Sequence, residues 1–315
     1  MPAKKTIVVL GATGYQGGGL AQAALGDPSG EFAVRAVTRD PDSQKARALA
    51  ALGAEVVSGD IGDEGAMTRI LEGADGAFLV TFFWEHMAPG RETAEAASLA
   101  RAAKAAGVPH VIWSTLEDTR QQVPLTDDRM PTLEDSYKVP HYDAKGEADR
   151  FFAELEVPTT YLRTSVYWES FVHYGLCPMR DDDGTMVLTL PIGEGRLATI
   201  AAEDIGRSAL EILRRGQEFL DRTVGIAGGH LSGEEFAQGF AAALGEPVQY
   251  RPLTPAQYRA LGTPAAQDLG NMFQYSVEFE DSYCGIRDID LTRSLNPRLL
   301  TFPEWAVANK DKIPR

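Results

Sequence analysis

A short apolar run followed at once by regularly spaced glycines constrains this chain more than any other feature. Residues 6–10 read Thr-Ile-Val-Val-Leu, and Gly11, Gly14 and Gly17 follow at the start of an Ala- and Leu-rich stretch. A β-branched run of this kind is typical of a buried parallel strand. Glycines between a strand and a helix allow a tight turn, close approach of backbone N–H groups to a pyrophosphate, and close packing of the helix on the strand. The segment therefore predicts a strand–turn–helix unit with an anion site at the helix N-terminus.

The first half of the chain keeps alternating between short apolar runs and helical stretches. Strands are expected at residues 6–10, 32–38, 55–58, 77–81, 110–114 and 159–163. This alternation predicts an α/β fold, a doubly wound parallel sheet of the Rossmann type, with a smaller C-terminal α/β lobe. We expect a dinucleotide-binding domain over residues 1–165 and a lobe for substrate or partner over residues 166–315, interleaved with the sheet edge. In that lobe, Ser232 with Glu235 and Thr254 with Gln257 predict capping boxes at two helix starts.

The residue after the second strand indicates which dinucleotide is expected. NAD binding needs an acidic residue at this strand end, where it accepts hydrogen bonds from the ribose hydroxyls. Here Thr38 ends the strand and Arg39 follows it. A guanidinium binds a 2′-phosphate bidentately and loses little where no carboxylate competes for it. The sequence therefore favours NADP(H), with Asp40 expected to cap the next helix; the alternative for Arg39 is a solvated surface charge.

Residues at the ends of the next two strands extend this predicted site. Asp60 follows the third strand, where its carboxylate or the neighbouring backbone can meet the adenine edge; the alternative is a helix cap or a loop acid. Thr81, Phe82 and Phe83 follow the fourth strand. Their backbone and rings are expected to line the ribose and the nicotinamide, because the carboxyl ends of parallel strands share one edge of the sheet.

Charge and residue types exclude several other functions. The 315 residues include 30 basic and 45 acidic side chains, a net charge of −15, which disfavours direct binding to nucleic acid or to an anionic membrane. The two cysteines and five scattered histidines have no metal-ligand spacing, so no metal is expected. The apolar run at residues 6–10 is too short for a signal peptide, and no stretch of ~18 apolar residues follows. We therefore expect a cytoplasmic protein without a membrane span.

Taken together, these motifs resemble the NmrA-like family, an atypical branch of the short-chain dehydrogenase/reductase superfamily, and within it the HSCARG-type NADPH sensor proteins. The resemblance extends over nearly the whole chain and rests on residues 11–19, 37–39, 53–57, 59–60, 80–85, 116–117, 141–147 and 268–273. It implies a Rossmann domain, NADP(H) binding and a smaller C-terminal lobe. By position it implies that the cofactor contacts Gly11, Thr13, Gly14, Gln16, Gly17, Arg39, Asp60, Ile61, Phe82, Phe83, Lys145 and the segment Tyr167, Trp168, Glu169 and Ser170.

The chain departs from the family pattern at two places on this surface. Family members often carry a basic residue shortly after the arginine, whereas Asp42 and Ser43 precede Lys45 here. This weakens the expected clamp on the 2′-phosphate. Ser170 stands where the family often has an asparagine, which leaves the nicotinamide side of the site less defined.

The residues expected at the nicotinamide leave the catalytic chemistry open. Active short-chain reductases place Tyr and Lys at i and i+4 on one helix, with a Ser at the end of strand five; the Tyr donates a proton to the carbonyl. Here Ser114 ends that strand, His141 precedes Lys145 by four residues, and Tyr142 precedes it by three. His141 can donate a proton, or it can simply form hydrogen bonds at the helix start. Tyr142 is a second candidate acid, and Lys145 is expected at the ribose.

Two functions remain. The first is a redox or cofactor sensor with weak or no catalysis, which the absent Tyr favours. The second is an NADPH-dependent reductase of a carbonyl, quinone or imine, which Ser114, His141 and Lys145 favour. A small-molecule substrate or a protein partner is expected, and the sequence is compatible with a monomer or a dimer.

Overall fold

The main sheet has the strand order that the alternating pattern predicts. In the computed structural model, which describes residues 3–173 and 175–314, seven strands lie in the order β11-β6-β5-β4-β1-β2-β3. They are β1 (Lys5–Leu10), β2 (Phe32–Thr38), β3 (Glu55–Ser58), β4 (Gly76–Leu79), β5 (Val111–Thr115), β6 (Thr159–Arg163) and β11 (Thr223–Gly225). Every pairing among β1 to β6 is parallel. The predicted doubly wound α/β fold is confirmed; the edge strand β11 is an addition that the sequence analysis did not expect.

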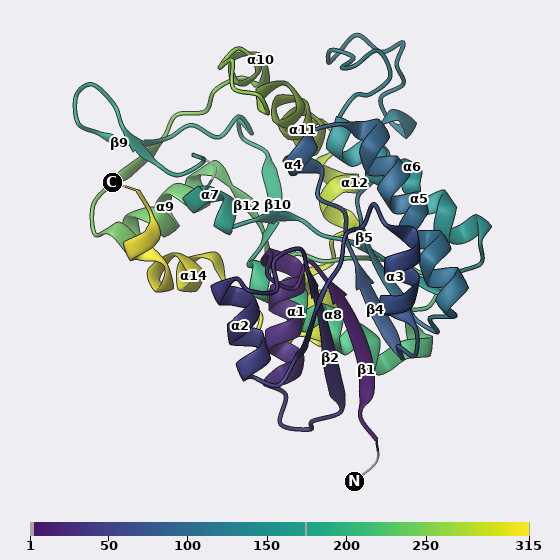
Figure 1. Ribbon diagram of the computed structural model, residues 1–315. Helices are drawn as coiled ribbons and strands as arrows, with labels where there is room; N and C mark the ends of the chain where they lie inside the picture. Colours follow the sequence, from purple (N-terminus) through teal and green to yellow (C-terminus); the bar gives the residue numbers. More distant parts are fainter. Residues whose placement is uncertain (1–2, 174, 315) are drawn as a thin grey trace. The chain divides into compact units, whose positions relative to one another are not determined.

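Helices cover both faces of this sheet (Figure 1). One face carries α1 (Tyr15–Leu25), α2 (Gln44–Ala51) and α8 (Ala202–Arg215), and the other carries α3 (Glu64–Leu71), α5 (Pro89–Ala106) and α6 (Pro140–Glu154). The short α4 (Phe83–His86) connects β4 to α5. A right-handed crossover after each strand places successive helices in this way.

Small side chains let the helices lie close to the sheet. Ala96, Ala100 and Ala103 of α5 are fully buried, in a core cluster with the apolar residues of β1, β4 and β5. Trp113 of β5 stacks on Phe152 of α6 with 4.9 Å between the ring centroids. This packing holds the carboxyl ends of the strands in a fixed array, which is where ligands bind in open α/β sheets.

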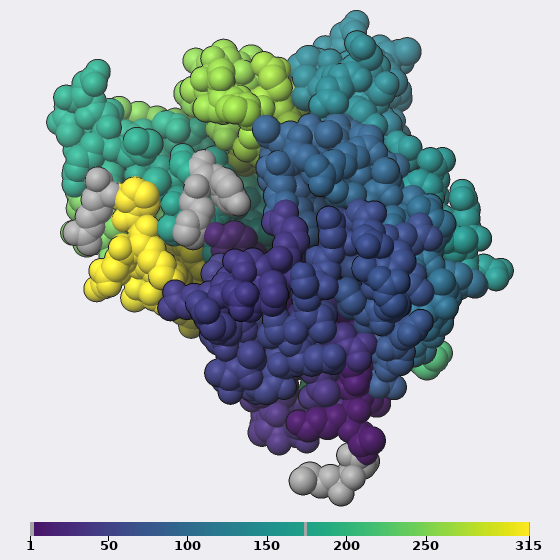
Figure 2. All heavy atoms as spheres, viewed as in Figure 1, coloured from purple at the N-terminus to yellow at the C-terminus, as the bar shows by residue number. Residues whose placement is uncertain are grey.

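The chain passes repeatedly between two units. The first contains the residues up to Asp118 together with His141–Arg163 and Ala202–Val224. The second contains Thr119–Pro140, Thr164–Ala201 and the chain from Gly225 onward. In the space-filling view, the purple-to-blue part of the chain forms a continuous surface of the first unit (Figure 2). The division into domains of residues 1–165 and 166–315, made from the sequence, stays a prediction.

The second unit has two small sheets, ordered β12-β10-β7 and β13-β9-β8. Their strands are β7 (Val166–Tyr167), β8 (Met179–Arg180), β9 (Met186–Leu188), β10 (Arg196–Ile200), β12 (Gly229–Ser232) and β13 (Val248–Tyr250). Its helices are α7 (Glu169–His173), α9 (Gly233–Leu244), α10 (Pro255–Arg259), α11 (Ala266–Glu278), α12 (Glu280–Gly285), α13 (Ile289–Leu295) and α14 (Phe302–Ala308). Both predicted capping boxes are confirmed, at the starts of α9 and α10. Among the described residues, no helix combines the length and apolar character that a membrane span requires.

Candidate functional site

The turn between β1 and α1 has the geometry for which its glycines are needed. Gly11 has a φ of +64°, in the left-handed region that favours glycine. A Cβ at Gly17 would lie 2.5 Å from the carbonyl oxygen of Leu10 and 2.6 Å from that of Gly11. Gly14 is the N-cap of α1, and the first turn of this helix has no acidic side chain. The positive end of the helix dipole is therefore available to a pyrophosphate.

A cavity of about 310 Å³ opens beside this turn, at the carboxyl ends of β1, β2 and β3. Its lining includes six of the residues that the sequence analysis assigned to the cofactor, namely Gly11, Thr13, Arg39, Asp60, Ile61 and Phe82. It also includes Lys45, Glu85, His86, Arg91 and Glu95, which were not assigned. The volume lies at the lower end of the range for small-molecule sites. Basic and acidic side chains are mixed in the lining, so the cavity is not uniformly positive.

Arg39 is already paired in this cavity. Its two terminal nitrogens donate to the two carboxylate oxygens of Glu85 at 2.5 and 2.6 Å, and its guanidinium carbon lies 5.8 Å from the centroid of the Phe82 ring. The expectation that no carboxylate competes for Arg39 is therefore wrong. Glu85 lies on α4 after β4, and the parallel arrangement of β1, β2 and β4 brings it beside Arg39 from 46 residues away.

The residues after Arg39 differ from the expectation in two further ways. Ser43, not Asp40, caps α2, because its side chain accepts a hydrogen bond from the Ala46 N–H. Asp40 instead accepts one from the Asp42 N–H. Lys45 lines the cavity, and its Nζ donates to the carbonyl oxygen of Thr13 at 3.2 Å. Lys45 stands farther from Arg39 in the sequence than the basic residue of the family pattern. The first turn of α2 nevertheless places it in the wall of the cavity.

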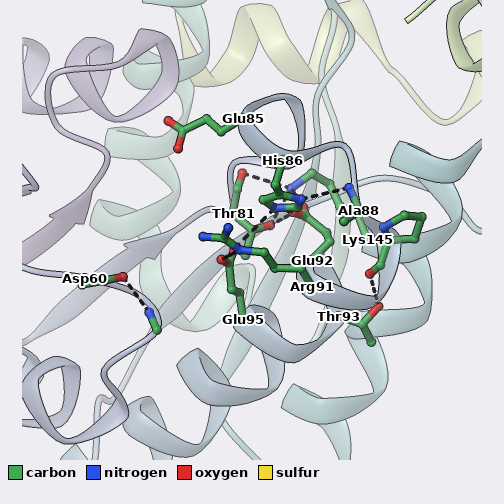
Figure 3. Close-up of polar contacts among 12 residues, drawn as sticks. Asp60, Thr81, Glu85, His86, Ala88, Arg91, Glu92, Thr93, Glu95 and Lys145 are labelled. Carbon is green, nitrogen blue, oxygen red and sulfur yellow. Dashed lines mark hydrogen bonds and ion pairs between the residues drawn. The ribbon is translucent and has the colours of Figure 1, made fainter. Parts of the chain in front are cut away.

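Asp60 and Ile61 follow β3 and lie at the cavity wall. The Asp60 carboxylate accepts a hydrogen bond from the Gly62 N–H at 2.9 Å (Figure 3). Asp63, three residues later, caps α3 through the Ala66 N–H. Asp60 therefore shapes the loop after β3 and leaves the helix cap to Asp63.

Lys145 is bound in a buried ion pair. Its Nζ lies 2.6 Å from Oε1 of Glu92 and donates to Oγ1 of Thr81 at 2.7 Å (Figure 3). The Thr81 hydroxyl in turn donates a short hydrogen bond to Glu92. Glu92 is completely buried in α5, and the sequence analysis missed it because an acid on an Ala-rich helix carries no local signal. The cluster fixes Lys145 at the end of β4, beside the backbone of Thr81.

His86 lies against the same acidic side chains. Its Nε2 is 3.5 Å from Oε2 of Glu92 and 3.6 Å from Oε2 of Glu95, and these buried oxygens form no hydrogen bond (Figure 3). The three side chains have the types and spacing of metal ligands. However, Nδ1 of His86 accepts a hydrogen bond from the Ala88 N–H at 3.0 Å, so a neutral ring carries its proton on Nε2. A metal bound at Nε2 would require the ring proton on Nδ1 and would cost the hydrogen bond from Ala88, so this contact favours an Nε2–H group that faces the two carboxylates.

The three remaining catalytic candidates are buried. Ser114 donates to Oε1 of Gln16 at 2.8 Å, which connects β5 to α1. His141 is 5% exposed and Tyr142 is 2% exposed, both near the start of α6. The His141 ring centroid lies 4.6 Å from that of Trp84 and 4.7 Å from that of Tyr142. His141 and Lys145 lie one turn apart on α6, as their spacing predicts.

The other residues assigned to the cofactor lie in three places. Phe83 begins α4 and is buried, with its ring centroid 5.9 Å from that of His141. Tyr167 lies in β7, and Glu169 and Ser170 lie in α7, all in the second unit. Within that unit, the Glu169 carboxylate accepts a hydrogen bond from the indole N–H of Trp305 at 3.0 Å. Their assignment to the cofactor stays a prediction.

The largely buried carboxyl of Asp149, on α6, has a raised pKa. Burial raises the pKa of Asp149 from 3.8 to about 7, although hydrogen bonds to Thr115 and Trp113 oppose the shift. Thr115 Oγ1 lies 2.6 Å and Trp113 Nε1 3.0 Å from Oδ1 of Asp149. Arg163 and Lys145 also favour the charged form. Near pH 7 both protonation states of this side chain are therefore populated.

We expect Asp149→Asn to remove a pH dependence of stability. The folded state holds the Asp149 proton up to a pKa of about 7 and the unfolded state releases it near 3.8, so folding stability falls as pH rises between these values. From pH 5 to pH 8 the wild-type free energy of unfolding should fall by about 2–3 kcal/mol relative to the variant, whose amide oxygen still accepts both hydrogen bonds. Urea titrations at the two pH values measure this. The exposed Asp182→Asn is the control, and parallel pH profiles of the wild type and Asp149→Asn would contradict the expectation.

Known proteins resemble this chain in sequence and in fold. The model of the NmrA-like family matches residues 3–306. An NmrA-like family domain-containing oxidoreductase, FrzB, from Cladobotryum sp is 29% identical over 86% of this chain and 83% of its own length. An NAD(P)H azoreductase from Xenophilus azovorans is 26% identical over 96% of this chain and 97% of its own. The crystal structure of NmrA, a negative transcriptional regulator, in complex with NADP has a TM-score of 0.77 and 24% identity, covering 96% of this chain and 94% of that one.

Proposed function

Because the chain belongs to the NmrA-like family, we propose that it binds NADP(H) and acts as a cofactor sensor with weak or no catalysis. The observation that carries this proposal is the cavity at the carboxyl ends of β1, β2 and β3, lined by Gly11, Arg39 and Lys45. Dinucleotides bind at this end of a doubly wound sheet. The NAD(P)H azoreductase and the NmrA structures in complex with NADP and with NAD support a nicotinamide dinucleotide as the ligand, and the choice of NADP(H) rests on Arg39 and Lys45.

Several parts of the cofactor have a suitable partner on this chain. The turn from Gly11 to Gly17 presents backbone N–H groups and the start of α1 to the pyrophosphate. Arg39 and Lys45 provide two positive charges for the 2′-phosphate. The Phe82 ring forms an apolar part of the cavity wall. Lys145 is held at the end of β4, where the ribose of the nicotinamide would bind.

The candidate proton donors favour sensing over catalysis. His141, Tyr142 and Ser114 are each at least nine-tenths buried, and the position four residues before Lys145 holds histidine instead of tyrosine. A general acid has to come within hydrogen-bond reach of the atom that it protonates. With these groups packed among other side chains, cofactor occupancy itself is the signal that a protein partner would detect.

A second candidate function is an NADPH-dependent reductase of a carbonyl, quinone or imine. The names of FrzB and of the azoreductase, each aligned over most of this chain, favour it. In that case a bound NADPH would supply the hydride, and His141 or Tyr142 on α6 would supply the proton. Steady-state NADPH oxidation with a panel of quinones, azo dyes, aldehydes and cyclic imines separates the two functions. Turnover of one of these substrates that falls ~10²–10⁴-fold in the His141→Ala variant would establish the reductase function and contradict the sensor function.

Calorimetric titration tests the cofactor itself. We expect NADP⁺ or NADPH to bind more tightly than NAD⁺ or NADH, because Arg39 lies in the cavity. Arg39→Ala should weaken NADP(H) binding by about 10–100-fold, the range for a hydrogen bond to a charged group, and should change NAD(H) binding much less. Arg101→Ala, which removes a guanidinium paired with Glu64 away from the cavity, is the control. Equal affinities for the two cofactors in the wild type would contradict the proposed preference.

A further inference from the structure

Glu85 already binds the Arg39 guanidinium, which is the group that a 2′-phosphate would bind. The two N–H groups of one guanidinium edge bind the two oxygens of one carboxylate, at 2.5 and 2.6 Å. This is the bidentate arrangement in which a guanidinium also binds phosphate. Both side chains line the cavity, so a phosphate that approaches Arg39 meets a carboxylate that is already in place.

We propose that Glu85 limits the preference of this site for NADP(H) over NAD(H) by competing with the 2′-phosphate for Arg39. The inference rests on the proposed function, since it concerns the same dinucleotide site. A 2′-phosphate of NADP(H) has to displace Glu85 before it can bind this terminal edge of the guanidinium. NAD(H) carries a ribose hydroxyl at this position and can bind with the ion pair intact. The pair therefore weakens binding of NADP(H) and does not obstruct binding of NAD(H).

The ion pair also gives NAD(H) a partner that β2 does not supply. Sites for NAD usually have a carboxylate at the end of β2, which accepts hydrogen bonds from the ribose hydroxyls. In this chain Arg39 stands there, and Glu85 brings a carboxylate to the same place from α4. The site thus holds a guanidinium for one cofactor and a carboxylate for the other. Glu85 narrows the preference for NADP(H) that Arg39 alone would produce.

Displacement of Glu85 requires little rearrangement. Its side chain is 44% exposed and that of Arg39 is 65% exposed, so the carboxylate can turn into solvent without unpacking a core. Pairs with this exposure contribute little to stability, since water solvates both charges. The cost that remains is the lost pairing and the repulsion between the released carboxylate and the bound phosphate. Both would be measured as weaker NADP(H) binding.

Glu85→Gln tests the proposal, and Glu64→Gln is its matched control. Glu64 on α3 has the same 44% side-chain exposure and pairs with Arg101 at 2.8 Å, but it is not among the residues that line the cavity. The two substitutions change the net charge equally, so a general electrostatic effect appears in both. Calorimetry with NADP⁺ and with NAD⁺ at one salt concentration gives the ratio of the two affinities for each variant, and circular dichroism confirms that each is folded.

We expect Glu85→Gln to raise the NADP⁺ affinity by about five- to tenfold. The NAD⁺ affinity should change by less than about twofold, because the glutamine amide oxygen still accepts a hydrogen bond from a ribose hydroxyl. Glu64→Gln should leave the ratio as it is in the wild type. In an Arg39→Gln background the gain from Glu85→Gln should fall below about threefold, because no guanidinium remains to be released.

Three results would overturn the proposal. An affinity ratio that is the same in Glu85→Gln and Glu64→Gln would show that the ion pair does not affect cofactor choice. A gain that persists in full without Arg39 would assign the effect to repulsion alone. Absence of binding of either dinucleotide to the folded wild type would overturn the proposed function and this inference together, whereas binding with an unchanged ratio overturns only the inference.

Discussion

Replacing Lys145 with methionine is expected to lower the free energy of unfolding by about 3–5 kcal/mol, because it leaves a buried carboxylate without its cation. Glu92 is completely buried, and its Oε1 lies 2.6 Å from Nζ of Lys145. Its other oxygen forms no hydrogen bond and faces His86. Methionine keeps much of the length and apolar volume of lysine, so the lost charge is the main change.

A second substitution separates this electrostatic effect from lost packing. Glu92→Gln in the Lys145→Met background removes the unpaired charge, and we expect it to restore about half or more of the lost stability. Lys104→Met on the exposed side of α5 is the matched control and should change stability by less than about 0.5 kcal/mol. Urea unfolding followed by circular dichroism gives all four values. A Lys145→Met variant as stable as the wild type would show that Glu92 does not depend on this cation.

The second large effect is expected from Gly17→Ala. The added methyl group would lie 2.5 and 2.6 Å from two carbonyl oxygens and 2.8 Å from a carbonyl carbon, all of them backbone atoms of β1 and the turn. Backbone cannot rotate away as a side chain can, so α1 has to move off the strand. We expect a loss of about 3 kcal/mol in stability and at least about a tenfold loss of NADP(H) affinity, since the N–H groups of the turn move with the helix.

Gly65→Ala is the control for this substitution. Gly65 lies in α3, and its nearest neighbours would be 3.6 Å from the added methyl group. The exchange should be neutral or stabilise the helix by up to about 1 kcal/mol. Thermal unfolding and calorimetric titration with NADPH measure both properties. Wild-type melting temperature and affinity in Gly17→Ala would contradict the close approach between α1 and β1.

Much of the fold was accessible from the sequence because its signals are local. A strand such as β2 was predicted with its observed limits, Phe32–Thr38, since an apolar run of that length between polar turns is typical of a buried strand. The capping box of Ser232 and Glu235 involves residues three apart and was likewise predicted. The edge strand β11 was not, because three residues carry too little pattern to be distinguished from a loop.

The candidate site divides in the same way. The turn formed by Gly11, Gly14 and Gly17 could be predicted from their spacing, since the turn and the helix start involve residues that are close together in the sequence. The acidic partners of Arg39 and Lys145 could not be predicted in this way. Glu85 and Glu92 are distant from them in the chain and become neighbours only where parallel strands end together.

The sequence by itself therefore determined that this chain forms a doubly wound sheet with a dinucleotide turn after its first strand, because periodicity and glycine spacing act over a few residues. Only the tertiary structure decided which charged side chains of the site are paired. It paired Arg39 with Glu85 and placed Lys145 on the buried Glu92. The physical reason is that Coulomb interactions and desolvation depend on distance and burial in space, and separation along the chain indicates neither.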